Sequence, residues 1–107
     1  MSRFGDVVER LALVIESRRG GDPARSWSAR LIGDPTLAAK KLAEESLEAA
    51  LAAVQQDKPA LARESGDLIY HWLAVLAGAG VSLDDVAAAL EAREGLSGID
   101  EKAARKL

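Results

Sequence analysis

Two pairs of carboxylates with the same spacing are the residues of this chain best suited to chemistry. Glu45 and Glu48 lie three positions apart, and so do Glu64 and Asp67. In a helix, side chains at i and i+3 point the same way, so each pair forms a two-oxygen claw. Two such claws facing one another would repel unless a cation lay between them. Four carboxylates without cysteine describe a site for a hard cation, Mg²⁺ or Mn²⁺.

The second claw opens an apolar helix. From Leu68 to Ala77 nearly every residue is apolar, which predicts a helix buried on most sides. His71 lies one turn beyond Asp67 on the same face. Because it is the only histidine, it cannot form a histidine-based metal site. A hydrogen-bonded core role is favoured over a role as a ligand.

The residues alone also permit a simpler interpretation of the first claw. Acidic pairs in alanine-rich helices usually form solvated faces, and Lys40 and Lys41 stand four residues before Glu44 and Glu45. The second claw, at the head of an apolar helix, argues against that interpretation. Since Mg²⁺ usually bridges carboxylates to phosphates, the pattern indicates a phosphate-bearing substrate.

The elements that must position these side chains are predicted to be helices. Alanine and leucine dominate and aromatic residues make up 4% of the chain, which favours helix over sheet. Periodicity and capping signals predict helices over residues 2–19, 36–56, 59–77 and 82–94. A short turn at 57–59 makes the middle two antiparallel, with Glu48 and Glu64 at comparable heights. We expect a single all-α domain over residues 1–107, a four-helix bundle completed by dimerisation, with a polar tail at 96–107 and a short helical turn from Asp100.

The apolar residues of the second helix predict which of its sides meets the core. In the second helix we take Leu47 as the direction of the core, with Ala43, Ala50, Leu51 and Val54 around it.

Residues 22–36 are expected to be irregular and functional, because long loops in compact domains seldom lack a role. In this loop Trp27 is either a hydrophobic anchor or a surface for a base. Arg18 and Arg19, at the end of the first helix, either cap it or contact phosphate.

Composition excludes several other classes of function. The chain has no cysteine, so it has neither disulfides nor thiolate metal sites. Its net charge of −3 gives no electrostatic case for binding nucleic acid. The sequence contains no run of about 18 apolar residues, the length that a membrane-spanning helix needs. The charged N-terminus does not resemble a secretory signal. We therefore expect a cytoplasmic protein.

Together these motifs resemble the phosphoribosyl-ATP pyrophosphohydrolases, within the all-α nucleoside triphosphate pyrophosphatase superfamily. The resemblance rests on residues 26–31, 40–48 and 64–71 and on the tail at 97–105. Trp27, Ser28 and Arg30 stand where the family typically has tyrosine, threonine and lysine. Gly66 stands where alanine is frequent and is more typical of MazG-like house-cleaning nucleotide pyrophosphatases.

The resemblance implies hydrolysis of phosphoribosyl-ATP to phosphoribosyl-AMP and pyrophosphate, the second step of histidine biosynthesis. Glu45, Glu48, Glu64 and Asp67 would hold Mg²⁺, with Mn²⁺ possible, and Glu44 would be a further ligand or the general base. The candidates for the substrate's phosphates are Arg30, Lys40, Lys41 and Arg18 or Arg19, and Trp27 would face the adenine or a ribose. The superfamily also implies a homodimer or a dimer of dimers. The alternatives are a house-cleaning pyrophosphatase of noncanonical nucleotides and a helical dimerisation module without catalysis.

Overall fold

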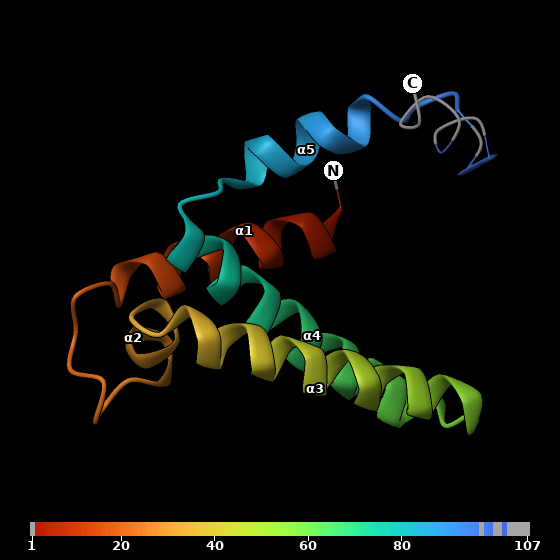
Figure 1. The fold of residues 1–107 in the computed structure, drawn as a ribbon. Helices are drawn as coiled ribbons and strands as arrows, with labels where there is room; N and C mark the ends of the chain where they lie inside the picture. The colour runs from red at the N-terminus through yellow and green to blue at the C-terminus, as the bar shows by residue number, and fades with distance from the viewer. Residues whose placement is uncertain (1, 97, 100–101, 103–107) are drawn as a thin grey trace.

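Helix α4 is the element against which three of the other helices pack. The computed structural model describes residues 2–96, 98–99 and 102. Its helices are α1 (Arg3–Ser17), α2 (Trp27–Ile32), α3 (Pro35–Val54), α4 (Lys58–Ala79) and α5 (Leu83–Glu91), as Figure 1 shows. Helices α1, α2 and α3 each contact α4, and α2 also contacts α3. The expected all-α class is confirmed.

The segment at 22–36, expected to be irregular, contains helix α2. Ser26 caps its start, with the Oγ accepting a hydrogen bond from the amide of Ala29 at 3.1 Å. Four of its six residues are buried. The prediction of a loop was wrong because the breakers Pro23, Gly33 and Pro35 indicate irregular structure, whereas the helix between them has only six residues, fewer than two turns. The described residues therefore form five helices rather than four.

The other helix boundaries follow local capping chemistry. The N-caps are Ser2, Asp34, Asp57 and Ser82, and each side chain accepts a backbone amide hydrogen bond. Helix α5 begins with a capping box, since the carboxylate of Asp85 also accepts a hydrogen bond from the amide of Ser82 at 2.9 Å. Helix α5 ends at Glu91, earlier than the predicted 94. The helical turn expected from Asp100 lies outside the described residues.

The core lies where α1, α2, the start of α3 and the second half of α4 meet. Its buried apolar side chains are Ile15, Leu31, Ile32, Ala38, Leu73 and Ala74.

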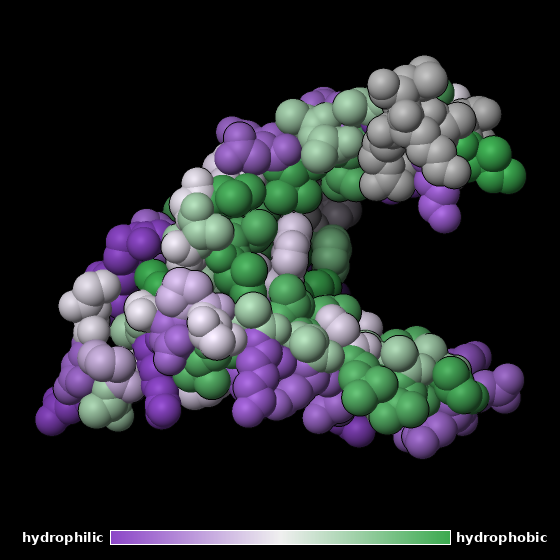
Figure 2. All heavy atoms as spheres, in the orientation of Figure 1, coloured by the Kyte–Doolittle hydropathy of each residue, from purple (hydrophilic) through white to green (hydrophobic). Residues whose placement is uncertain are grey.

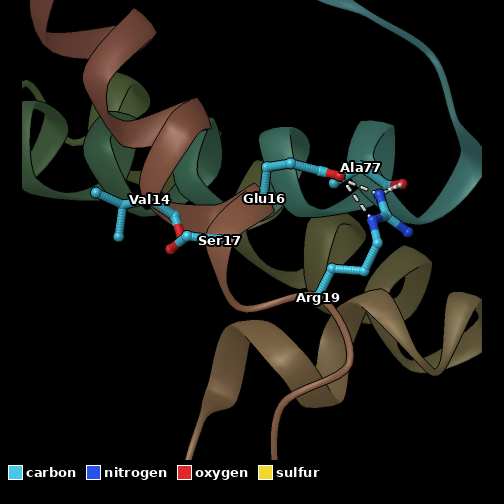
Figure 3. Close-up of polar contacts among 5 residues, drawn as sticks. All are labelled: Val14, Glu16, Ser17, Arg19 and Ala77. Atoms are coloured by element: carbon cyan, nitrogen blue, oxygen red, sulfur yellow. Dashed lines mark hydrogen bonds and ion pairs between the residues drawn. The ribbon is translucent and has the colours of Figure 1, made fainter.

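Figure 3 shows how Arg19 closes this junction between α1 and α4. Its guanidinium binds Glu16 through two hydrogen bonds of 2.7 and 2.9 Å and donates to the carbonyl of Ala77 at 2.6 Å. Arg19 therefore caps the end of α4 rather than its own helix.

Beyond this junction the chain spreads into two arms, the α3–α4 hairpin and the arm that contains α1 and α5 (Figure 1). Figure 2 shows an open angle between them, with hydrophobic residues along it. The radius of gyration is 15.8 Å, whereas a compact chain of this length has about 13 Å.

Within the described residues no single helix is long and apolar enough to cross a membrane; α4 and α5 qualify only as a pair bent by 106°.

The apolar stripe of α3 faces outward, so the predicted core direction was wrong. Leu47 and Val54 are 60% and 79% exposed, and Leu51 is also exposed. The residues of α3 that are buried are Ala38, Glu45, Ala49 and Ala52. Periodicity shows which residues share a face, but not which of two faces meets the neighbouring helix. Small alanines let α3 and α4 approach closely, which leaves the larger side chains unpartnered within the described residues.

Candidate metal centre

Three carboxylates converge between α3 and α4. Glu45 and Glu48 of α3 and Glu64 of α4 each place one oxygen within 4.8 Å of the other two. The turn at residues 55–57 folds α4 back along α3, so the expected comparable heights of Glu48 and Glu64 are confirmed. Glu45 is buried, Glu64 is half-buried and Glu48 is exposed. The cluster is therefore closed on its inner side and open to solvent on the other.

The cluster is electrostatically unbalanced. One oxygen of Glu45 and one of Glu64, the Oε2 in each case, are buried without a hydrogen-bond partner. Burial raises the pKa of Glu45, and the adjacent Glu48 carboxylate raises it further. For Glu64 the same Glu48 carboxylate, with which it can share a proton, is the first cause of a raised pKa, and burial is the second. Like charges at this separation hold protons that isolated carboxyl groups would release.

The donor set fits a hard divalent cation. All three ligands are carboxylate oxygens, and an octahedral Mg²⁺ with bonds of about 2.1 Å joins oxygens up to about 4 Å apart. Small side-chain adjustments would bring these oxygens from within 4.8 Å to that spacing. A cation would also supply the partner that the two buried oxygens lack. The geometry accordingly agrees with the metal site expected from the spacing.

Asp67 and Glu44 lie beside this cluster rather than in it. Asp67 is exposed and outside the group of three, but its charge raises the pKa of both Glu45 and Glu64. Glu44 accepts a hydrogen bond from Lys41 at 2.9 Å. That bond is the main reason why the pKa of Glu44 is lowered, and the charge of Lys40 adds to it.

His71 is buried next to the cluster and makes two hydrogen bonds. Its Nδ1 lies 2.8 Å from the carbonyl oxygen of Asp67, and its Nε2 lies 3.2 Å from the indole nitrogen of Trp27. The expected hydrogen-bonded role of this histidine is confirmed. Trp27 remains 40% exposed, and the guanidinium of Arg30 lies 5.8 Å from the centroid of its ring.

The two arginines after α1 lie away from the carboxylates of their own chain. Arg19 contacts Ala77, which is ten residues beyond Asp67 along α4, or about 15 Å. Arg18 lines a hollow of about 520 Å³ together with Arg25 and Ser26. The contact with Ala77 thus places Arg19 away from Glu45, Glu48 and Glu64.

Sequence reasoning did not foresee a second contact between α2 and α4. The hydroxyls of Ser28 and Tyr70 are 2.5 Å apart, directly beside the contact between Trp27 and His71. The available signal was that both stretches carry two adjacent polar or aromatic residues. One sequence gives no means of pairing residues that are more than 40 positions apart.

Known proteins are similar to this chain over nearly its whole length. Residues 8–94, which include every candidate site residue, match the family model described as phosphoribosyl-ATP pyrophosphohydrolase. A protein of Caulobacter vibrioides named phosphoribosyl-ATP pyrophosphatase is 62% identical over 103 residues, or 96% of each chain. Proteins of the same name from Methylobacterium radiotolerans and Cereibacter sphaeroides are 53% and 50% identical over 90% and 92% of this chain, and over 91% and 97% of their own.

Proposed function

The chain belongs to the phosphoribosyl-ATP pyrophosphohydrolase family, and from that premise we propose that it hydrolyses phosphoribosyl-ATP to phosphoribosyl-AMP and pyrophosphate. This reaction is the second step of histidine biosynthesis. The observation that carries the proposal is the convergence of Glu45, Glu48 and Glu64, with two buried oxygens that have no partner. Cleavage of the bond between the α- and β-phosphates leaves a strongly charged pyrophosphate, so the reaction requires a site that can hold a divalent cation.

Glu45, Glu48 and Glu64 would hold Mg²⁺, and Mn²⁺ suits the same oxygens. Asp67, whose charge already acts on Glu45 and Glu64, is the candidate to complete the set by a rotation of its side chain. When bound, the cation would neutralise phosphate charge and lower the pKa of a coordinated water. The carboxylates themselves fix where the phosphates and the water meet.

Glu44 is the candidate general base. Its hydrogen bond to Lys41 lowers its pKa and so keeps the carboxylate ionised, as a base must be, but also makes it a weaker base. If Lys41 turned to a substrate phosphate, Glu44 would lose this partner and its basicity would rise. The ion pair would then couple substrate binding to activation of the water.

The remaining cations are candidates to bind phosphate. Lys40 and Lys41 stand one and two turns before the α3 carboxylates, and Arg30 presents a planar fork that matches phosphate oxygens. Arg18 lines a hollow with Arg25 and Ser26 rather than the carboxylate cluster, so we assign it only to the site of a second copy. The exposed part of the Trp27 ring is available to the adenine or a ribose.

We propose that a second copy of this chain covers the apolar surface that the fold leaves exposed. The outward stripe of Leu47, Leu51 and Val54 is apolar and exposed, and the two arms leave an open angle (Figure 2). Such faces are stable when another surface covers them. We therefore propose a homodimer or a dimer of dimers.

Pyrophosphate release from phosphoribosyl-ATP, measured with Mg²⁺ and again with a chelator, tests the function. We expect release that requires the metal and that exceeds release from a panel of deoxynucleoside triphosphates. Preference for the deoxynucleotides would support a house-cleaning enzyme instead. No turnover of either substrate, together with no Mg²⁺ binding in calorimetry, would indicate a helical dimerisation module.

A further inference from the structure

Two hydrogen bonds, side by side, fasten α2 to α4. Adjacent residues of α2, Trp27 and Ser28, bind adjacent residues of α4, His71 and Tyr70. The His71 ring is 8% exposed and makes edge contacts with both aromatic neighbours, at 5.0 Å from Tyr70 and 6.3 Å from Trp27 between ring centroids. These four residues form what we call the α2 clip.

The clip determines which nitrogen of His71 carries the proton. An indole N–H can only donate, so the Nε2 of His71 must accept the hydrogen bond from Trp27. In the neutral ring the proton is then on Nδ1, which donates to the carbonyl of Asp67 at 2.8 Å. With both nitrogens engaged, His71 is neither a metal ligand nor a proton-transfer group here. It links the indole to the turn of α4 that carries Asp67 and Glu64.

The clip also places a cation. Arg30 lies one turn after Trp27, and its guanidinium is 5.8 Å from the centroid of the indole, within the range of a cation–π contact. Among the described residues the ion pairs involve Arg19, Arg25 and Lys41, and none involves Arg30. The donors of this arginine are therefore oriented by a ring that is itself held by His71.

We propose that the α2 clip is a positioning device that holds Trp27, and through it Arg30, in a fixed orientation next to His71, so that Arg30 meets a phosphate of the bound nucleotide. The identity of that nucleotide rests on the proposed function, whereas the clip itself does not. A guanidinium binds phosphate well only when both donors are aligned, and an error of about 1 Å weakens such contacts strongly. Trp27 and His71 are positioning residues and touch no reacting atom.

The first test reads the tautomer of His71 directly. Because His71 is the only histidine, nitrogen-15 NMR of the metal-free protein resolves a single imidazole. At a pH where the ring is neutral we expect the proton on Nδ1, and a shift toward the other tautomer in Trp27→Phe, which keeps an aromatic ring but lacks the donor. A wild-type ring protonated on Nε2 would overturn the clip.

The second test separates positioning from general stability. We expect Trp27→Phe to raise the KM for phosphoribosyl-ATP by about 10-fold, the size of one oriented hydrogen bond, while kcat changes by less than about 3-fold. In an Arg30→Gln background the same change should raise KM by clearly less than about 10-fold, because the cation that Trp27 positions is gone and only a contact of its ring with the adenine or a ribose remains. Additive effects of the two substitutions would overturn the proposal.

The controls keep the outcome interpretable. Arg25→Gln removes an arginine whose side chain is 89% exposed and should leave KM unchanged. Trp72→Phe makes the same change of ring as Trp27→Phe, but on α4 and outside the clip. Mg²⁺ affinity, measured by calorimetry, should be equal in wild type and Trp27→Phe. If the wild type releases no pyrophosphate from phosphoribosyl-ATP, the proposed function fails, and the tautomer alone decides for or against the clip.

Discussion

At the scale of single residues, the carboxylates of Glu45, Glu48 and Glu64 repel one another. Glu45 and Glu64 both have raised pKa values, and each is affected by Glu48. Protons and a divalent cation are alternative ways to relieve the same repulsion. In the metal-free protein, repulsion among the carboxylates that would bind the metal lowers the stability of the fold. Removing one of these charges should therefore lower activity but not stability.

The Glu64→Gln variant should lose activity without losing stability. The substitution removes a carboxylate from the cluster, so we expect pyrophosphate release to fall by about 100-fold or more, as expected when a metal ligand worth several kcal/mol is lost. In the metal-free protein the same change removes a like charge, so the midpoint of thermal unfolding should stay equal or rise. Glu9→Gln, an exposed change on α1, is the control for both measurements. A lower midpoint with unchanged activity per folded molecule would contradict a metal role for Glu64.

The pH dependence of stability should report the raised pKa of Glu45. A carboxyl group with a folded pKa above its ordinary value of 4.5 binds more protons in the folded state than in the unfolded state. In the window from 4.5 up to the raised pKa, the free energy of unfolding of the metal-free protein therefore falls as pH rises. The groups facing Glu45 are Glu48, His71 and Asp67, so we compare wild type with Glu45→Gln to isolate its contribution.

In this comparison, chemical unfolding in the presence of a chelator should show Glu45→Gln to be the more stable protein at neutral pH. Its advantage should shrink as the pH is lowered toward 4.5, because the wild-type carboxyl is then also uncharged. A difference that did not change with pH would show that Glu45 titrates at its ordinary value. The test needs no substrate and no metal.

The sequence predicted part of this site for a definite physical reason. Helical i, i+3 spacing places Glu45 and Glu48 on one face, and a short turn brings Glu64 to the same height, so local geometry was sufficient. Whether Asp67 turns toward the cluster, or whether Glu44 pairs with Lys41, depends on side-chain rotamers that spacing does not determine. The bond between Trp27 and His71 joins distant segments and could not be derived from one sequence.

At the scale of elements, local signals were informative and packing directions were not. Capping signals such as Ser2 and Ser82 were informative because each side chain interacts within the first turn of its own helix. Helix α2 was missed because six residues offer too little periodicity. The orientation of Leu47 was misjudged because alanines, rather than the largest apolar residues, form the contact with α4.

The turn between α3 and α4 contains a strained residue that can be relieved. Gln56 has a φ of +58°, a left-handed conformation that costs a residue with a side chain on the order of 1 kcal/mol. We expect Gln56→Gly to raise the free energy of unfolding by ~0.5–1 kcal/mol in chemical denaturation. The adjacent Gln55 has a φ of −76°, so Gln55→Gly should give no gain. Equal effects at the two positions would contradict a strained turn.

Two glycines of α4 should respond oppositely to alanine. A Cβ at Gly78 would lie 3.2 Å from the carbonyl oxygen of Ile32, so Gly78→Ala should push α2 from α4 and lower the free energy of unfolding by about 1–3 kcal/mol. A Cβ at Gly66 would meet nothing within 4 Å, so Gly66→Ala should gain about 1 kcal/mol in helix propensity. Thermal and chemical unfolding of the pair measure both effects. Stabilisation by Gly78→Ala would show that α2 does not depend on this close approach.

At the scale of the whole molecule, the chain is more open than its size requires. Its radius of gyration of 15.8 Å exceeds the roughly 13 Å of a compact domain of this length. Small domains bury a limited share of their surface, and here the α3 stripe and the α1 residues Phe4 and Leu13 remain exposed. The fold supplies one packed junction and two arms, and the arms expose an apolar surface that a second copy of the chain would cover.

The oligomeric state and its dependence on the α3 stripe test this view. We expect light scattering to report a dimer or a tetramer, with a midpoint of thermal unfolding that rises with protein concentration, because association stabilises the folded state by mass action. Leu47→Glu places a charge on the stripe, at a side chain that is 60% exposed, and should shift the protein toward a monomer and abolish the concentration dependence. Ala53→Glu, on another exposed face of α3, makes a similar charge change and should leave the assembly intact. A wild-type monomer, or equal dissociation by both variants, would mean that the stripe is not the interface.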